Sequence, residues 1–329
     1  MGNHSPLVNQ RHVMTAPPEH GCCDSEGTPK SNFSAAMPHT PSLLSRIGNP
    51  RLWFPLGIIV LGIFSFLGWQ HFYPVQAADG WSLRTFQGGI PMVSAMVIDG
   101  RDNLYVSQEF KNEKGAILWL HADGKRQEIV NKLSKPDGLA LFQDGIAIAQ
   151  EGGKHPVLWW RGGETRSLFS GDSIEGLASD GRNLFAIEDV KQNGRLLKYD
   201  PETKETMTLR DGLEEGEGVT VCPDGRLFYT EKKKGWIKKF SPGNDDEVIA
   251  RGLQAPSFLL CNTEGLWITE DLTHRARFLL LDYSGAMHTI LSHLRSPQTI
   301  LSIGKERLLV AEQGRGRILE VKRTTHATQ

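Results

Sequence analysis

One short sequence pattern occurs six times along this chain: a few apolar residues followed by Gln or Glu. The copies read LYVSQ, IAIAQ, LFAIE, LFYTE, LWITE and LLVAE. They end at Gln108, Gln150, Glu188, Glu231, Glu270 and Glu312, with spacings of 42, 38, 43, 39 and 42 residues. A repeat of about 40 residues built from short strands is typical of β-propeller blades. We therefore predict an all-β, six-bladed β-propeller with the six polar ends distributed around one axis.

Each repeat can be divided into four strands, most clearly in the fourth repeat. Residues 217–222 form its first strand, and the Pro-Asp-Gly-Arg sequence at 223–226 suits a tight turn. Residues 227–231, 235–240 and 247–253 form the other three strands. We call these strands A to D, from the propeller axis outward. The same order in the other repeats predicts four-stranded blades.

The sixth repeat ends after its strand C, near Val321. Residues 81–86, just before the first repeat, have the length and alternation of a strand D. Pairing this N-terminal strand with the last repeat would close the last blade and leave no open edge in the ring. The propeller is therefore predicted to span residues 81–323. A seven-bladed or irregular β fold is the alternative.

Residues 52–72 are predicted to form a single N-terminal transmembrane helix. The segment 52–69 carries no charge and has tryptophans near both ends. At about 1.5 Å per residue it crosses most of a hydrocarbon core about 30 Å thick, and its aromatic ends suit the two interfaces. Residues 1–51, rich in Pro, Ser, Thr, Asn and His, are predicted to be a disordered cytoplasmic tail. Residues 73–80 are a linker, and 324–329 are a short disordered tail.

The basic residues around this helix predict its orientation. Arg46 and Arg51 precede it, whereas no Lys or Arg follows until Arg84. The positive-inside bias then keeps the N-terminus cytoplasmic and places the propeller in a periplasmic, extracellular or lumenal space. A cleaved signal peptide is the alternative, with a plausible cut site at residues 75–77. A segment of 51 residues before the apolar run is far too long for an ordinary signal peptide.

Charge and cysteine content exclude several classes of function. The net charge of −1 at pH 7, without a basic stripe, argues against nucleic-acid binding. Four cysteines are too few and too scattered for a disulfide framework or a zinc cluster. Cys222 and Cys261 lie near the far ends of adjacent A strands, but their positions in the repeat differ by one residue. Their side chains are predicted to point opposite ways, so no disulfide between them is expected.

Several motifs resemble known propeller families. They are PDGLA at 136–140, EGLA at 175–178, EGVTVCPDGRLFYTE at 217–231 and the Gly-Arg or Gly-Trp starts of strand C. The pattern resembles the senescence marker protein 30 (gluconolactonase), strictosidine synthase, paraoxonase-type, NHL-repeat and streptogramin lyase propellers. An anchored layout resembles the adipocyte plasma membrane-associated type. The resemblance covers about three quarters of the chain and is specific for fold, whereas the chemistries of these families differ.

The starts of the A strands and the ends of the B strands are expected to meet at one mouth of the channel. The A-strand starts are Ser94, Asp137, Glu175, Glu217, Ser257 and Gln298. Crowded carboxylates raise one another's pKa unless a cation neutralises them, and Ca²⁺ accepts six to eight oxygen ligands. The resemblance implies a metal at this mouth, so a divalent cation, Ca²⁺ above all, is the expected cofactor. The candidate ligands are Asp137, Glu175, Glu217, Glu188 and Glu231.

Departures from the family pattern leave alternatives open. Ser94 stands where a ligand Glu is expected. The near-identical B-strand ends also suit a structural role, bonding the backbone, because a catalytic site normally breaks symmetry. His155 and His274 fall in B–C loops on the mouth face, and His274 follows Glu270 by four residues. Glu270, His274 and His155 are the candidate catalytic residues, although ordinary loop histidines are the alternative.

The predicted function is that of a membrane-anchored, extracytoplasmic, divalent-metal-dependent hydrolase acting on a small lactone or ester at the channel mouth. One alternative is a non-catalytic propeller that binds a small ligand or a protein partner as a scaffold subunit. A further alternative is a metal-dependent lyase, which requires His274 beside Glu270 and a metal. The membrane is contacted through residues 52–72, and nucleic acid is not an expected partner.

Overall fold

The computed structural model of the protein describes residues 50–304 and 306–324. Most of the predicted N-terminal tail and nearly all of the predicted C-terminal tail lie outside the described residues. The apolar N-terminal segment forms one helix, α2 (Pro50–Phe72), which includes Pro55. Its segment Trp53–Phe72 has a mean hydropathy of 1.6. An apolar N-terminal helix long enough to cross a membrane is therefore confirmed.

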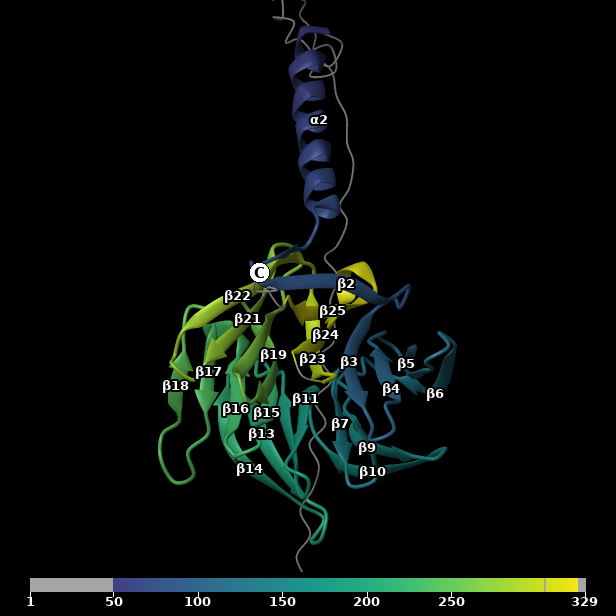
Figure 1. Ribbon diagram of the computed structural model, residues 1–329, viewed down its shortest axis with the longest axis vertical. Coiled ribbons are helices and arrows are strands. Elements are labelled where there is room, and N and C mark those ends of the chain that lie inside the picture. The colour runs from purple at the N-terminus through teal and green to yellow at the C-terminus, as the bar shows by residue number, and fades with distance from the viewer. Residues whose placement is uncertain (1–49, 305, 325–329) are drawn as a thin grey trace, which may run out of the picture. The chain divides into compact units, whose positions relative to one another are not determined.

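The rest of the chain forms six antiparallel sheets, each corresponding to one predicted blade (Figure 1). Blade 1 contains β3 (Val93–Ile98), β4 (Leu104–Gln108), β5 (Gly115–Leu120) and β6 (Arg126–Leu133). Blade 2 contains β7 (Leu139–Phe142), β8 (Gly145–Ile148), β9 (Pro156–Arg161) and β10 (Glu164–Ser170). Blade 3 contains β11 (Ile174–Ser179), β12 (Leu184–Glu188), β13 (Gly194–Asp200) and β14 (Glu205–Leu213).

The second half of the propeller follows the same order. Blade 4 contains β15 (Val219–Val221), β16 (Leu227–Glu231), β17 (Trp236–Lys239) and β18 (Glu247–Ala250). Blade 5 contains β19 (Pro256–Asn262), β20 (Gly265–Glu270), β21 (Ala276–Asp282) and β22 (Met287–Leu294). Blade 6 contains β23 (Pro297–Ser302), β24 (Arg307–Glu312) and β25 (Arg317–Arg323). The 3-10 turns η1 (Lys232–Lys234) and η2 (Gln313–Arg315) follow β16 and β24.

An N-terminal strand closes the last blade, as predicted. β2 (Trp81–Gly88) pairs antiparallel with β25 along its whole length, from Trp81 opposite Arg323 to Gly88 opposite Arg317. Blade 6 therefore has the strand order β2-β25-β24-β23 (Figure 1). The six-bladed, four-stranded architecture is confirmed. It leaves no inner or middle strand of the ring without a neighbour.

The linker contributes a strand that the sequence did not suggest. β1 (Gln76–Ala77) pairs with β22, so that blade 5 has five strands. The backbone N–H of Ala78 donates to the carbonyl of Ile290 at 2.9 Å, and Val75 packs against the core shared by blades 5 and 6. Of residues 75–77, the plausible signal-peptide cut site, residues 76 and 77 thus belong to a folded sheet, and Val75 packs against the core.

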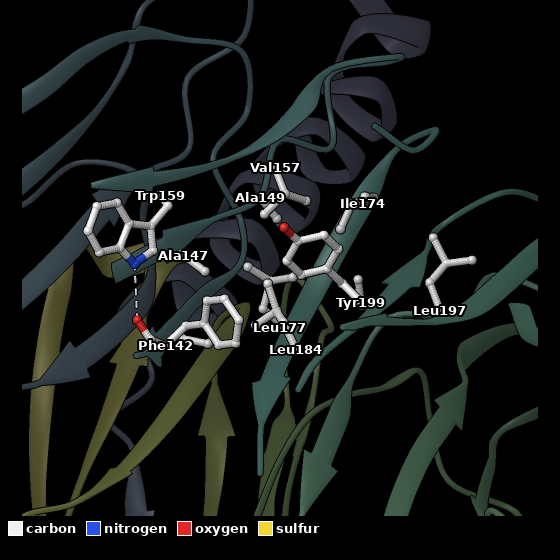
Figure 2. Packing of buried hydrophobic residues seen from close by; sticks show 12 residues of the cluster. Phe142, Ala147, Ala149, Val157, Trp159, Ile174, Leu177, Leu184, Leu197 and Tyr199 are labelled. Atoms are coloured by element: carbon white, nitrogen blue, oxygen red, sulfur yellow. Dashed lines mark hydrogen bonds between the residues drawn. The ribbon is translucent and has the colours of Figure 1, made fainter. Parts of the chain in front are cut away.

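The hydrophobic core consists of clusters that lie between neighbouring blades. Each blade contributes one face of its sheet to the cluster on one side and the other face to the cluster on the other side. Figure 2 shows the core between blades 2 and 3, where the ring centroids of Phe142 and Tyr199 lie 6.3 Å apart. The indole N–H of Trp159 donates to the carbonyl of Phe142 at 3.0 Å (Figure 2). Ala147 of β8 packs in this core, whereas Ile148, the next residue along the strand, packs in the core shared with blade 1. This alternation follows from the two-residue period of a strand.

The same alternation corrects the prediction about Cys222 and Cys261, which form a disulfide with a Cα–Cα distance of 4.9 Å. Neighbouring blades are related by rotation about the propeller axis, so opposite faces of their two sheets meet. Alternate residues of a strand point to opposite faces. Residues of blades 4 and 5 that face each other therefore differ by an odd number of positions in the repeat. Phe228 of blade 4 and Ile268 of blade 5 meet in this core although their positions in the repeat differ by one. Side chains that point opposite ways on adjacent blades therefore face each other.

Candidate functional site

Six buried polar residues line the centre of the propeller. The inner strands β3, β7, β11, β15, β19 and β23 contact one another in this order, and β23 contacts β3, which closes the ring. The residues predicted to begin these strands lie within two residues of the observed strand starts, and all six are buried: Ser94, Asp137, Glu175, Glu217, Ser257 and Gln298. Four of the six inner strands have a register shift at this point, and such bulges redirect side chains.

A repeated backbone turn brings a second set of residues to the same place. Two residues before each inner-strand start, the chain adopts a left-handed conformation at Met92, Lys135, Ser173, Glu215, Ala255 and Ser296. The carbonyl of this residue accepts a hydrogen bond of 2.8 to 3.0 Å from the backbone N–H of the residue that follows strand B, as in the bonds from Glu151 to Lys135 and from Asp189 to Ser173. The residue after strand B is thereby held beside the channel.

The inner-strand starts and the left-handed turns together bring carboxylates from blades 1, 2 and 3 close to one another. Oxygens of Glu109, Asp137 and Glu151 lie within 4.8 Å of one another, and so do oxygens of Glu151, Glu175 and Asp189. Glu151 belongs to both groups. We call these five residues the acidic cluster. Of the predicted metal ligands, it contains Asp137 and Glu175.

Lys135 pairs with carboxylates of the acidic cluster, and Lys232 pairs with carboxylates that lie outside it. The ammonium of Lys135 pairs with Glu151 and lies 3.1 Å from the carboxylate of Glu109. The ammonium of Lys232 lies 2.7 Å from Glu217 and 3.1 Å from Asp271. Glu217 is the third predicted metal ligand at the start of an inner strand, after Asp137 and Glu175. It lies beside the acidic cluster, on blade 4. The cluster is only partly neutralised by these two cations.

Some channel oxygens have no partner among the described residues. Oγ of Ser257 and Oε1 of Gln298 are buried without a hydrogen bond in that part of the chain, whereas the carboxyl group of Glu217 is hydrogen-bonded to that of Glu175. Glu175 is also buried, and no Lys, Arg or His of the described ranges lies within ion-pairing distance of it. Buried polar atoms normally have partners, so these atoms mark a place for a bound ion or polar ligand.

Burial controls the protonation of these carboxyl groups. Burial, reinforced by Glu109, raises the pKa of Asp137 well above its ordinary value, and burial with Glu217 does the same for the pKa of Glu175. Burial raises the pKa of Glu217 to about 7 and that of Asp189 to about 6. Carboxyl groups with such pKa values exchange protons near neutral pH.

These shifts predict how stability depends on pH. Burial raises the pKa of Glu217 above its ordinary 4.5 to about 7, so the folded chain holds a proton that the unfolded chain releases. The free energy of unfolding therefore falls as pH rises between these two values. In a chelating buffer we expect the melting temperature to fall by several degrees between about pH 5.5 and about pH 8. Glu217→Gln is expected to weaken this dependence, and a melting temperature that rises over this range would contradict the assignment.

The predicted catalytic Glu270 and the predicted ligand Glu188 are held inside their blades instead of in the acidic cluster. Glu270 receives two hydrogen bonds of 2.6 Å from Arg277 and one of 2.7 Å from the backbone N–H of Gln254. Glu188 is bound in the same way by Arg195 of strand C and by the backbone N–H of the loop before its inner strand. Each therefore ties three parts of one blade together.

Glu231, also a predicted ligand, has the same arrangement with lysines. Its oxygens lie 2.6 Å from Lys238 and 2.7 Å from Lys234. Consecutive residues at the end of a strand point to opposite sides. The residue that follows each B-strand end thus reaches the channel, whereas the B-strand end itself turns into the blade.

Gln108 and Gln150, the two neutral residues among the six B-strand ends, also form hydrogen bonds within their own blades. In blades 3 to 6 strand C supplies a Lys or Arg to the Glu, whereas strand C of blades 1 and 2 has none at this position. Gln150 accepts from the backbone N–H of Ser134 at 2.9 Å and donates to Pro156 at 3.3 Å. Gln108 donates to the carbonyl of Pro91 at 3.0 Å, because proline has no N–H to offer. These contacts support the structural reading of the B-strand ends.

Replacing Glu270 by Gln should separate a structural role from a chemical one. The amide can still accept from Gln254, but Arg277 loses its charged partner. We expect a loss of about 2 kcal/mol in the free energy of unfolding, measured by urea denaturation, with cation binding unchanged. A variant of normal stability that has lost cation binding or activity would contradict the structural role.

The structure brings neither predicted histidine to the acidic cluster. Nδ1 of His274 is buried without a hydrogen bond among the described residues. Burial and the nearby Arg295 lower the pKa of His274. His155 lines a groove between blades 1 and 2 with Gln150 and Lys132. In the described ranges, neither imidazole forms an ion pair with a carboxylate of the cluster.

Sequence comparison relates the chain to strictosidine synthase-like proteins. The family model for strictosidine synthase matches residues 179–241. The protein named STRICTOSIDINE SYNTHASE-LIKE 6 of Arabidopsis thaliana is 27% identical over 172 residues, which is 50% of this chain and 39% of that protein. STRICTOSIDINE SYNTHASE-LIKE 3 from the same plant is 32% identical over 92 residues, 26% of this chain and 23% of that protein. The chain thus spans less than half the length of these curated relatives.

Structural comparison gives the same fold. A putative gluconolactonase aligns with 76% of this chain and 98% of its own at a TM-score of 0.61 and 12% identity. A gluconolactonase from Xanthomonas campestris covers 75% of this chain and 91% of its own, with a TM-score of 0.63 and 12% identity. A virginiamycin B lyase from Staphylococcus aureus covers 74% of this chain and 100% of its own, with a TM-score of 0.51 and 13% identity. The resemblance to strictosidine synthase-like and gluconolactonase-like propellers is confirmed.

Proposed function

We propose that this protein is a divalent-cation-dependent hydrolase of small lactones or esters, with its site at the channel mouth of blades 1 to 4. The observation that carries the proposal is the convergence of buried and partly buried carboxylates in the acidic cluster, with oxygens within 4.8 Å of one another in each of its two groups of three. Such a group is costly to bury unless a cation neutralises it. Ca²⁺, which prefers oxygen ligands in flexible geometry, suits this donor set best.

The residues present fit such a cation. Glu151, Glu175 and Asp189 would hold it, with Asp137 and Glu217 at the border of the site. Glu175 has no cationic partner within ion-pairing distance in the described chain, and the carboxyl group of Glu217 is hydrogen-bonded to it, so that two carboxyl groups meet there. These two features support an open site for an ion. Glu188 and Glu231, bound by Arg195 and lysines, leave the ligand set.

When bound, the cation would polarise a substrate carbonyl. The chain's own carboxyl groups would hold and move protons beside it. Burial raises the pKa of Glu217 to about 7, close to the pH at which a general acid or base works best. Glu217 is held by Lys232, which fixes its position. In this proposal Glu217 replaces His155, His274 and Glu270 as the acid–base candidate.

A second candidate is a non-catalytic propeller that holds a small ligand or a protein partner at the same mouth. One observation favours it: no described histidine pairs with the cluster, so the usual proton shuttle near neutral pH is missing there. The lyase alternative loses its support, because Glu270 is bound by Arg277 and not by His274.

The test uses the purified full chain in detergent. We expect Ca²⁺ to raise the melting temperature and to be required for hydrolysis of an aryl ester or a lactone. Glu175→Gln removes an ionised ligand and should weaken Ca²⁺ binding at least tenfold. Glu202→Gln, at an exposed ion pair with Arg182, is the matched control and should bind Ca²⁺ normally. Ca²⁺ binding without turnover would favour the binding alternative, and no binding at all would refute the cation site.

We further propose that α2 anchors the chain in a membrane and that the propeller lies on the non-cytoplasmic side. The Cys222–Cys261 disulfide supports this side, because disulfides persist in oxidising compartments. The pairing of residues 76–77 with blade 5 supports an uncleaved anchor, since cleavage there would remove a strand. The basic residues before the helix agree with this orientation.

A further inference from the structure

Lys135 occupies the centre of one half of the acidic cluster. Its ammonium pairs with Glu151 and with Glu109, at 3.1 Å from the latter. Its backbone is fixed on both sides: its N–H donates to Phe110 at 2.8 Å, and its carbonyl accepts from Glu151 at 2.9 Å. The side chain therefore leaves a rigid turn and ends among carboxylates from two blades. It is mostly buried, with 21% of the side chain exposed.

The two halves of the cluster differ in how their carboxylates are satisfied. Around Lys135, the amide of Gln313 also donates to Glu109, and the hydroxyl of Ser94 donates to Asp137. Every carboxylate of this half thus has a donor from the chain itself. In the other half, Glu175 has no cation within ion-pairing distance among the described residues, and the group hydrogen-bonded to it is another carboxyl group, that of Glu217.

We propose that Lys135 is a tethered cation that takes the place of a metal ion at Glu109, Asp137 and Glu151. The inference rests on the proposed cation site and defines its capacity: the native chain holds one divalent ion, at Glu151, Glu175 and Asp189. An ammonium supplies three donors and a single charge that cannot dissociate from the protein. It therefore neutralises its half of the cluster permanently and excludes a second metal ion.

Lys232 supports the same reading on blade 4. It pairs with Glu217 and Asp271, at 2.7 and 3.1 Å, in the position that follows strand B. Blades 1, 2, 3 and 5 have a carboxylate at that position, so one blade of the ring replaces an acid by a base. The two lysines flank the half of the cluster that remains open.

The experiment counts bound Ca²⁺ on the full chain in detergent, by calorimetric titration and by elemental analysis after dialysis. Wild type is expected to bind one ion per chain. Lys135→Met keeps the length of the side chain without its charge, and this variant should bind two. Adding Glu109→Gln to Lys135→Met should return the count to one. Lys114→Met, at an exposed lysine of blade 1, is the matched control and should leave the count at one.

The outcomes separate this inference from the proposed function. Two ions on wild type, or an unchanged count of one in Lys135→Met, would overturn the role of Lys135 while leaving the cation site intact. No ion on wild type but one on Lys135→Met would keep the tethered cation and refute the native site. If Lys135→Met folds only when Ca²⁺ is added, as circular dichroism would show, the ion replaces the ammonium as proposed. Failure to fold with or without Ca²⁺ would count against it.

Discussion

Replacing Gly218 by Ala is expected to destabilise the propeller by about 3 kcal/mol, because the added methyl group has no room. Gly218 follows Glu217 at the start of blade 4, and a Cβ there would overlap the carbonyl oxygen of Ser257 on blade 5. That oxygen belongs to the backbone of the next inner strand, so it cannot move away as a flexible side chain could. Relief would require the two inner strands to separate.

The same change should disturb the site as well as the fold. Separating blades 4 and 5 moves Glu217 relative to Lys232 and Asp271, so Ca²⁺ binding is expected to weaken together with stability. Gly100→Ala is the matched control, since nothing lies within 4 Å of a Cβ at that turn. Urea denaturation of both variants provides the comparison. Equal stability of Gly218→Ala and wild type would show that the inner strands are not in close contact here.

Replacing Cys222 and Cys261 together by Ala is expected to lower the free energy of unfolding by about 4 kcal/mol. The disulfide joins residues that are 39 apart in the sequence. A cross-link across a loop of this length lowers the entropy of the unfolded chain, which stabilises the folded chain by about 4 kcal/mol. Both cysteines lie in the core between blades 4 and 5, so alanine keeps the site apolar. Wild type treated with a reducing agent should show the same loss, measured by thermal or urea denaturation.

Peptide mass spectrometry tests the disulfide together with the placement of the propeller. The full chain is purified from membranes after its free thiols have been blocked with an alkylating agent. We expect the peptides containing Cys222 and Cys261 to be recovered joined. Recovery of both as alkylated thiols would contradict the disulfide and the oxidising compartment together. An N-terminus at Ala78 would contradict the uncleaved anchor.

Most of the fold could be predicted from local patterns. The period of about 40 residues, the alternation along strand C and the unfinished sixth repeat lead to six four-stranded blades and a closing N-terminal strand, all present in the structure. The two-residue strand β1 could not be predicted in this way. It depends on pairing with β22, more than 200 residues away, and has too few residues for a pattern of its own.

The candidate site was only partly accessible from sequence. Asp137, Glu175 and Glu217 were found because they differ between blades at an equivalent position. Glu188, Glu231 and Glu270 were chosen because they end strand B, but their charge partners on strand C turn them into the blade. Glu109, Glu151 and Asp189 directly follow B-strand ends, and their place at the channel depends on the left-handed turns that hold their backbone. Lys135 was missed, although it stands two residues before Asp137.

The sequence by itself determined the number of blades, the strands within each and the polar residues that begin the inner strands, because these depend on periods read along one stretch of chain. The tertiary structure alone decided which side chains meet. Rotation between blades brings opposite faces of neighbouring sheets together. Cys222 and Cys261, which differ by one position in the repeat, therefore face each other and form a disulfide. The left-handed turn before each inner strand places Glu151 beside Lys135 and Glu175. Contacts between repeats depend on the angle between blades, and no single repeat encodes that angle.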